Sequence, residues 1–282
     1  MLTAQIRPFR FALVAFAPVR LSVLNHKKTS ADISGSLFAI VDERISEACE
    51  KNLCKEGFEI IKLPRDERLG SAVCSHTDIL LFSHQNTLIA SRQYIDAHED
   101  VKEALYRAIP SLDLRLSDEE ISHKYPLDAI FNAKAVKNKL FAKSDSVSKK
   151  ILNYAKEKNL GIVSVKQGYV ACTTLFVGEE FAITSDDGMA RALRAEGMDV
   201  LKIHESEKIK LPPYRNGFIG GTAGIFGNTV YFLGNLNSHP EGKDIELNLL
   251  KRGYRAVSLD TNADSLFDLG GIILTECADA DC

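Results

Sequence analysis

Four of the five equivalent loops of the sequence include residue types that can carry out nucleophilic chemistry or bind a cation. His76 and Asp78 lie in the first loop, Asp128 in the second, Cys172 in the third and Asp268 in the last. A cysteine thiolate is a strong nucleophile, and a nearby histidine can accept and return protons. Carboxylates around the same point favour a cationic ligand. These residues would form a nucleophilic, cation-binding site if the fold brings their loops together.

Each loop precedes a short apolar strand that completes one copy of a repeated unit. The unit reads strand, helix, strand, loop and strand, and a turn leads into the next copy. The first strands begin near residues 38, 88, 140, 181 and 230, so the steps are 50, 52, 41 and 49 residues. A recurring period of this size is typical of repeat architectures.

The fourth copy shows the pattern most clearly. Its first strand is predicted over Phe181–Thr184, Asp186 lies in the predicted helix cap, and Gly197 ends the helix. In the first copy, Asp42 is predicted to cap a helix over residues 43–56 because its carboxylate can accept the unpaired amides of the first turn.

These units predict an α/β protein, a five-bladed α/β propeller with five strand–helix–strand–strand repeats around a pseudo-fivefold axis. The alternative is a doubly wound sheet, which alternates strands and helices but does not predict a hairpin between all units. In a closed propeller the equivalent loops of all units meet near the axis, which would gather the residues of the five loops.

The repeats predict one domain over residues 37–275. An N-terminal extension over residues 1–36 has no acidic residue before Asp32, and its short apolar run is interrupted by Pro18. This extension is expected to pack loosely or not at all, with a weak secretory signal as the alternative. Residues 276–282 are expected to form a short acidic tail.

The composition limits the partners of the chain. A net charge of -3 gives no basic surface for nucleic acid, and no apolar run is long enough to cross a membrane. The six cysteines show no C-x-x-C spacing, which argues against a metal site and favours reduced thiols in a cytoplasmic protein. The glycines at 217, 220 and 221 precede a strand rather than follow one, so they do not form a dinucleotide loop and no cofactor is expected. The sequence does not indicate an oligomeric state.

The five units resemble the pentein fold of the guanidino-group-modifying superfamily, which includes arginine deiminases, agmatine deiminases, amidinotransferases and dimethylarginine hydrolases. The segments VKQGYVAC, AITSDDG, GFIGG and YPLD are similar to a bacterial branch of that superfamily. The resemblance covers roughly residues 37–275. It implies a cysteine nucleophile, an H-x-D histidine and acidic residues that hold a guanidinium.

The order of these parts differs from that of the enzymes, in which the cysteine lies in the last unit and the H-x-D two units earlier. Here His76-Thr77-Asp78 lies in the first unit and Cys172 two units later. The segment Asp268–Gly271 is similar to the acid-bearing loop of the enzymes. Because a closed ring has no privileged start, the same site can be formed with the order shifted around the ring.

The resemblance therefore predicts a cysteine-dependent hydrolase or transferase that acts on a guanidino or amidino group. Its catalytic residues would be Cys172, His76 and Asp268, and a small cationic, guanidino-like ligand would be its partner. The predicted substrate-binding residues are Asp78, Asp128, Tyr125, Tyr169, Gln167 and Phe218. In the alternative interpretation the chain is a non-catalytic propeller that binds a small ligand or a protein. Cys172 is then a core residue, His76 bonds a neighbouring loop, and the aspartates cap turns.

Overall fold

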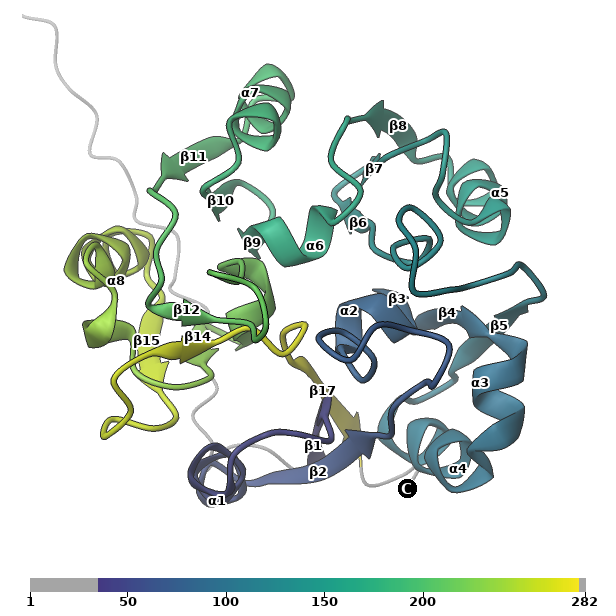
Figure 1. Ribbon diagram of the computed structural model, residues 1–282, viewed down its shortest axis with the longest axis horizontal. Helices are drawn as coiled ribbons and strands as arrows, with labels where there is room; N and C mark the ends of the chain where they lie inside the picture. Colours follow the sequence, from purple (N-terminus) through teal and green to yellow (C-terminus); the bar gives the residue numbers. More distant parts are fainter. Residues whose placement is uncertain (1–34, 279–282) are drawn as a thin grey trace, which may run out of the picture.

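The computed structural model describes residues 35–278, whose strands pair into five three-stranded sheets and one two-stranded sheet (Figure 1). The chain is thus of the α/β class, as predicted. The predicted N-terminal extension lies outside the described residues except for Gly35 and Ser36. Among the helices of residues 35–278, none has the length and apolar character needed to cross a bilayer.

The five three-stranded sheets share one topology, in which a middle strand pairs in parallel with an outer strand and antiparallel with an inner strand. The middle strands are β1 (Gly35–Asp42), β4 (Thr87–Ser91), β7 (Lys139–Ala142), β10 (Phe181–Thr184) and β14 (Thr229–Phe232). The outer strands are β2 (Phe58–Leu63), β5 (Asp113–Ser117), β8 (Gly161–Ser164), β11 (Asp199–Lys202) and β15 (Arg255–Ser258). The inner strands are β17 (Ile273–Ala278), β3 (Leu81–His84), β6 (Lys134–Val136), β9 (Thr174–Val177) and β13 (Ala223–Phe226).

Helices connect each middle strand to its outer strand and lie at the rim of the molecule (Figure 1). They are α1 (Glu47–Lys55), α3 (Arg92–Ala97) with α4 (Glu99–Ala108), α5 (Lys149–Glu157), α7 (Asp187–Ala195), and α8 (Gly242–Lys251) with the short η3 (Leu236–Ser238). The two-stranded sheet pairs β12 (Ile209–Lys210) with β16 (Leu266–Phe267).

Both faces of every middle strand are buried, because successive side chains of a strand point to opposite faces. In β1, Phe38 and Ile40 pack toward the sheet of β4, whereas Ala39 and Val41 pack toward the sheet of β14. The other middle strands alternate in the same way, so five hydrophobic clusters each fill the space between two neighbouring sheets. This explains why the middle strands read as continuous apolar runs.

The first and last described strands pair with each other. Gly35 lies opposite Ala278, and Ser36 lies opposite Cys277. Strand β1 thus begins two residues before the predicted domain start at residue 37, and β17 runs three residues past residue 275. Cys277 is disulfide-bonded, so the expectation of reduced thiols is wrong there.

The structure confirms one of the two predicted helix caps and contradicts the other. The side chain of Asp186 accepts the Met189 N–H over 2.7 Å, as predicted. The predicted cap at Asp42 is wrong, because Ser46 caps α1 and the buried Asp42 carboxylate binds Arg44 and the Ser75 hydroxyl instead. Asp42 thereby fixes the residue that precedes His76.

Candidate functional site

The turns that precede the inner strands converge, and they carry the candidate residues. α2 (Thr77–Leu80) precedes β3, α6 (Val170–Thr173) precedes β9, and η2 (Gly220–Thr222) precedes β13. Residues 129–132 and 268–271 occupy the same position before β6 and β17. In Figure 1, α2 and α6 lie near the centre of the molecule.

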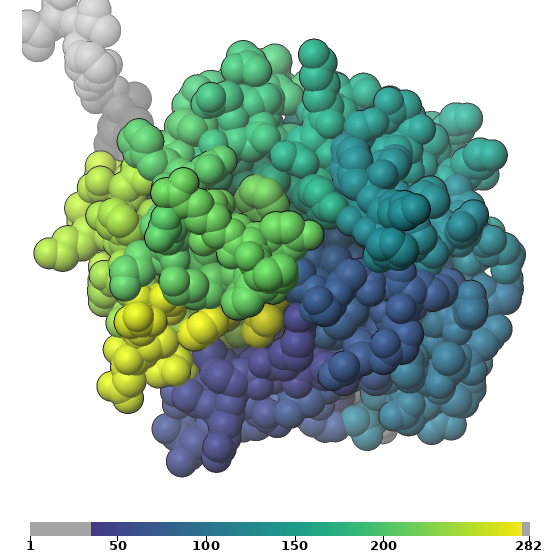
Figure 2. Space-filling model, viewed as in Figure 1, coloured from purple at the N-terminus to yellow at the C-terminus, as the bar shows by residue number. Residues whose placement is uncertain are grey.

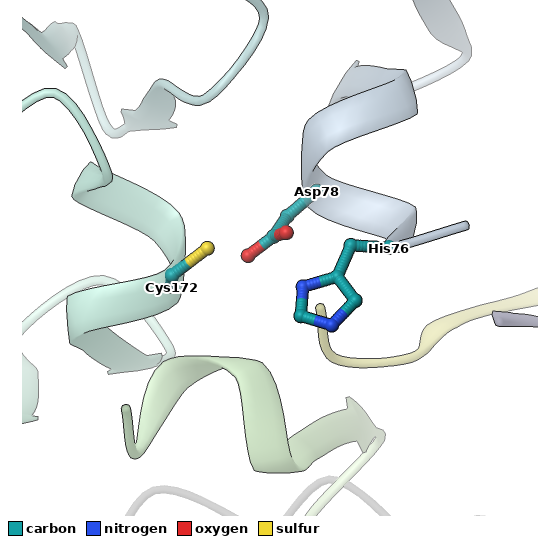
Figure 3. A group of neighbouring side chains, drawn as sticks. All are labelled: His76, Asp78 and Cys172. Carbon is teal, nitrogen blue, oxygen red and sulfur yellow. The ribbon is translucent and has the colours of Figure 1, made fainter. Parts of the chain in front are cut away.

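His76, Asp78 and Cys172 lie together although they come from different sheets (Figure 3). One imidazole nitrogen, one carboxylate oxygen and the sulfur all lie within 4.8 Å of one another. His76 and Cys172 are buried, with exposed fractions of 0% and 3%. Neither ring nitrogen of His76 and neither carboxylate oxygen of Asp78 has a hydrogen-bond partner among the described residues. The fold thus brings the predicted nucleophile and the predicted base together.

Asp268 lies beside this group. Its Oδ1 is 3.9 Å from Nδ1 of His76. The backbone N–H of Phe218 donates to Oδ2 over 2.8 Å, and the N–H of Gly270 donates to Oδ1 over 3.2 Å. Two backbone donors therefore fix the orientation of this carboxylate.

Two glycines make room for the approach of the turns. A Cβ on Gly221 would lie 1.8 Å from Oδ1 of Asp268. Gly270 has a φ of +73°, and a Cβ there would lie 2.6 Å from the Cβ of His76. Glycine is required at both positions for the site to close in this way.

Asn132 belongs to the same site and was missed in the sequence analysis. Its Nδ2 donates to the sulfur of Cys172 over 3.1 Å and to the main-chain oxygen of Asp78 over 3.0 Å. Its Oδ1 accepts the Ala171 N–H over 2.7 Å. Asn132 lies two residues before β6 and Cys172 two residues before β9, so counting back from the inner strands would have found it.

Burial keeps the imidazole and the thiol of the free site neutral. It lowers the pKa of His76 from 6.5 to about 3. It also raises the pKa of Cys172 well above its ordinary value, and the neighbouring carboxylates of Asp78 and Asp268 raise it further. In the free site no imidazolium is therefore present to lower the pKa of Cys172, because a buried imidazole does not hold its proton.

The two carboxylates are also shifted toward their protonated forms. Burial raises the pKa of Asp78 to about 6. Burial, and then the charge of Asp78, raise the pKa of Asp268 to about 7. A cation bound between these groups would let both ionise, because it replaces the lost solvation of each charge.

The other predicted binding residues lie around Tyr169. The Tyr169 hydroxyl donates to Asp128 over 2.6 Å, so Asp128 is engaged there rather than with Asp78 and Asp268. The ring of Tyr125 lies 5.7 Å from that of Tyr169, and Tyr125 is 49% exposed.

Gln167 and Phe218 have different surroundings. Gln167 donates to the helix cap Asp186 and accepts the Tyr169 N–H, so its amide stabilises the loop. Phe218 packs with Tyr169 on the hydrophobic cluster that contains Cys172.

His76, Cys172 and Asp268 are all buried. On the face shown in Figure 2, green, teal and blue segments meet near the centre. A cavity of about 550 Å³ lies between the inner strands and reaches Asp78. We call it the inner-strand cavity; Asp78, Ala171, Gly220 and Gly270, which precede inner strands, are among its lining residues. His76 and Cys172 are not among its lining residues, so Asp78 links the cavity to the buried group.

The same three side chains could also hold a metal ion. Nitrogen, oxygen and sulfur atoms of this kind are ligands for zinc and related ions. The arrangement therefore permits either a nucleophilic thiol with an adjacent imidazole, or three metal ligands.

Comparison with solved structures identifies the fold. Dimethylarginine dimethylaminohydrolase, as an adduct with 4-chloro-2-hydroxymethylpyridine, matches with a TM-score of 0.51 and 12% identity over 80% of this chain and 92% of that chain. An amidinotransferase of the saxitoxin biosynthetic pathway from Microseira wollei matches with a TM-score of 0.50 and 10% identity over 80% and 89%. Both belong to the pentein superfamily, so the chain has the pentein fold, as the sequence resemblance predicted.

Sequence comparison with curated proteins gave no match. A family model matches residues 40–273, which include every candidate residue described above. The chain therefore belongs to the family described as a family of unknown function, DUF6873.

Proposed function

We propose that the chain is a cysteine-dependent hydrolase or transferase that acts on the carbon of a guanidino or amidino group. Cys172 would be the nucleophile, His76 the proton carrier, and Asp78 and Asp268 the groups that hold the cation. The observation that carries the proposal is the approach of Cys172, His76 and Asp78 within 4.8 Å from two different sheets. A core cysteine needs neither an unpaired imidazole nor an unpaired carboxylate beside it.

The proposal includes a closed five-bladed α/β propeller, in which the blade order is shifted relative to known pentein enzymes. Five sheets of equal topology and five clusters between neighbouring sheets support the ring. Pairing of β1 with β17 supports its closure. In such a ring the Cys172 turn lies two blades from the His76 turn.

The bound cation would activate the thiol. Without ligand, burial and two carboxylates oppose the thiolate. A planar guanidinium can pair with a carboxylate through two parallel N–H groups, and its charge would offset the carboxylates near the sulfur. The thiol proton would pass to His76, where the nearby Asp268 carboxylate would stabilise the imidazolium.

The chemistry follows from these positions. The sulfur forms a bond to the guanidinium carbon, and the C–N π electrons move to nitrogen. His76 gives its proton to the departing amine as the C–N bond breaks. In a hydrolase, His76 then takes a proton from water as water attacks the carbon and the C–S bond breaks. In a transferase, an amine replaces that water.

A turnover assay tests the proposal. The full chain is incubated with a panel of guanidino and amidino compounds, and release of amine or ammonia is measured with and without a chelator. We expect release by wild type, none by Cys172→Ala, and no effect of the chelator. Binding of the same compounds by both proteins without release would instead favour the non-catalytic propeller. Loss of release with the chelator would assign the three side chains to a metal.

A further inference from the structure

One pattern recurs at the rim of four junctions between neighbouring sheets. There, a charged residue of an outer strand forms an ion pair with a residue at the C-terminal end of the helix that belongs to the neighbouring sheet. The four pairs are Glu59 of β2 with Arg107 of α4, Arg115 of β5 with Glu157 of α5, Asp199 of β11 with Arg252 after α8, and Arg255 of β15 with Glu56 after α1. Exposed ion pairs add little stability, but charged side chains along an outer strand keep other strands from pairing with it.

The junction between the sheets of β7 and β10 departs from this pattern. Its outer strand, β8, reads GIVS and contains no charged residue. Glu196, which follows α7, pairs instead with Lys139 of the middle strand β7 over 2.9 Å. Gly161, Ile162 and Ser164 are all exposed, and the exposed fraction of Ile162 is 41%. Strand β8, which lies at the rim between α5 and α7, is therefore the outer strand whose edge no charged side chain of its own protects (Figure 1).

The backbone of β8 also has an open edge. Within residues 35–278, β8 is the end strand of its sheet, which has the order β6-β7-β8. The N–H groups of Gly161 and Val165 donate to main-chain oxygens on the β7 side. Because backbone groups alternate in direction along a strand, the N–H and C=O groups of Ile162 and Ser164 point away from the sheet. An edge of this kind can accept a further strand.

The charges beside this edge are positive. Lys158 lies three residues before β8 and Lys166 two residues after it, and both side chains are exposed. Neither lysine forms an ion pair within residues 35–278, and the ammonium of Lys158 lies 5.8 Å from the centre of the Tyr154 ring. Glu157, the acidic residue nearest to both in the sequence, pairs with Arg115. An added strand with acidic side chains would therefore meet unpaired positive charge at both ends of the edge.

We infer that the outer edge of β8 is a docking site for an extended acidic segment of another protein, which adds a fourth strand to the sheet of β6, β7 and β8. Lysines beside an edge exclude other strands by charge, so they leave the edge open to a strand of opposite charge. They also disfavour a second copy of this chain, because antiparallel pairing of two β8 edges would bring lysines of both copies together. This docking site lies at the rim, and the inference does not depend on the proposed function.

Amide hydrogen exchange of the full chain, measured by NMR with two capped eight-residue peptides, tests the inference. In one peptide glutamate alternates with valine, and in the other lysine replaces glutamate. We expect the glutamate peptide to slow exchange at Ile162 and Ser164, because both N–H groups would donate to the added strand, and the lysine peptide to leave exchange unchanged. Protection by both peptides, or by neither, overturns the inference. Protection that appears without peptide as the protein concentration rises would assign the edge to a second copy, which also overturns it.

Two sets of variants locate the contact, with the affinity for the glutamate peptide measured by fluorescence anisotropy. Ser164→Pro removes an outward N–H, whereas its control Ser164→Ala removes only the hydroxyl. We expect the proline variant to bind roughly tenfold more weakly and the alanine variant to bind like wild type.

The second set reverses charge. Lys158→Glu combined with Lys166→Glu should weaken binding by roughly tenfold or more, because like charges would then face each other. The same change at Lys149 and Lys150, which lie at the other end of α5, is the matched control and should have little effect. Equal affinities of the two charge-reversed proteins overturn the inference, and this comparison decides the outcome even if the proline variant does not fold.

Discussion

The side-chain amide of Asn132 donates one hydrogen bond to the sulfur of Cys172 and another to the main-chain oxygen of Asp78. Its carbonyl oxygen accepts the N–H of Ala171. One side chain thus joins the turn before β6 to the turns that carry the candidate nucleophile and the carboxylate. An N–H donor at the sulfur stabilises the thiolate relative to the thiol.

Replacing Asn132 should make the Cys172 thiol less acidic. In Asn132→Ala the sulfur loses its donor while the carboxylates remain, so its pKa should rise further. We expect the alkylation rate of Cys172 at pH 8 to fall roughly tenfold, since one lost hydrogen bond to a charged group costs about one pKa unit or more. Iodoacetamide labelling over a pH series followed by peptide mapping measures this, and an unchanged rate would remove Asn132 from the site.

The charge of the reagent should decide how fast Cys172 reacts. A neutral reagent such as chloroacetamide should modify Cys172 more slowly than the exposed free thiol of Cys54, because burial and carboxylates oppose the thiolate. The amidinium analogue of the same size carries a positive charge toward Asp78 and Asp268. It should modify Cys172 at least tenfold faster than the neutral reagent does, by the charge pairing that stabilises a cation beside carboxylates.

Cys54 serves as the internal control for this comparison, since it lies outside the candidate site. At Cys54, replacing the neutral reagent by the amidinium reagent should change the rate of modification little. Equal ratios at both thiols would show that the site does not recognise an amidinium, and the proposed function would lose its main support.

Asp78 should make stability depend on pH. Its folded-state pKa of about 6 lies above the ordinary value of 3.8, so the folded chain binds the proton more tightly than the unfolded chain. This contribution to stability is fully present below about pH 4 and is lost as pH rises through about 6. Asp78→Asn removes the charge and leaves the buried group neutral at every pH. It should raise the free energy of unfolding at pH 8 by about 1–3 kcal/mol relative to wild type.

Urea unfolding of both proteins at pH 5 and pH 8 gives this comparison. His76 acts in the opposite direction, because its lowered pKa costs stability as pH falls from about 6.5 toward 3. Both proteins contain His76, so most of its contribution cancels when the free energy of unfolding of wild type is subtracted from that of Asp78→Asn. If the two proteins differ in free energy of unfolding by the same amount at pH 5 and pH 8, the raised pKa of the Asp78 carboxylate is contradicted.

Gly221→Ala should disrupt the site through Asp268. The added methyl group would lie 1.8 Å from Oδ1 of Asp268, so the carboxylate must leave its two backbone donors. We expect a lower melting temperature and loss of the selective reaction with the amidinium reagent. Gly70→Ala is the matched control, because its added methyl meets nothing within 4 Å. Equal behaviour of the two variants would mean that the close approach at Gly221 is not needed.

Local signals made much of the fold predictable. The strand Phe181–Thr184, the cap at Asp186 and the stop at Gly197 were read correctly, because alternation, capping and a left-handed glycine each depend on neighbouring residues. The extents of β1 and β17 could not be predicted from local signals, because β1 pairs with a strand far away in the sequence. Nothing near Gly35 in the sequence reports that partner.

The candidate site was predictable in position but not in electrostatics. His76 and Cys172 meet because both occupy the turn before an inner strand, and such repetition is visible in the sequence. Burial is not visible there, so the neutral imidazole and the high pKa of the thiol were not foreseen. Nor could the sequence show that Tyr169 engages Asp128.

The pairing of β1 with β17 has a consequence for synthesis of the chain. On the ribosome β1 emerges long before its partner β17, because the two strands lie far apart in the sequence. Until then the inner edge of β1 exposes unpaired N–H and C=O groups beside an apolar strand, which is the kind of edge that invites association with other chains. This sheet can therefore be completed only after β17 has been synthesised.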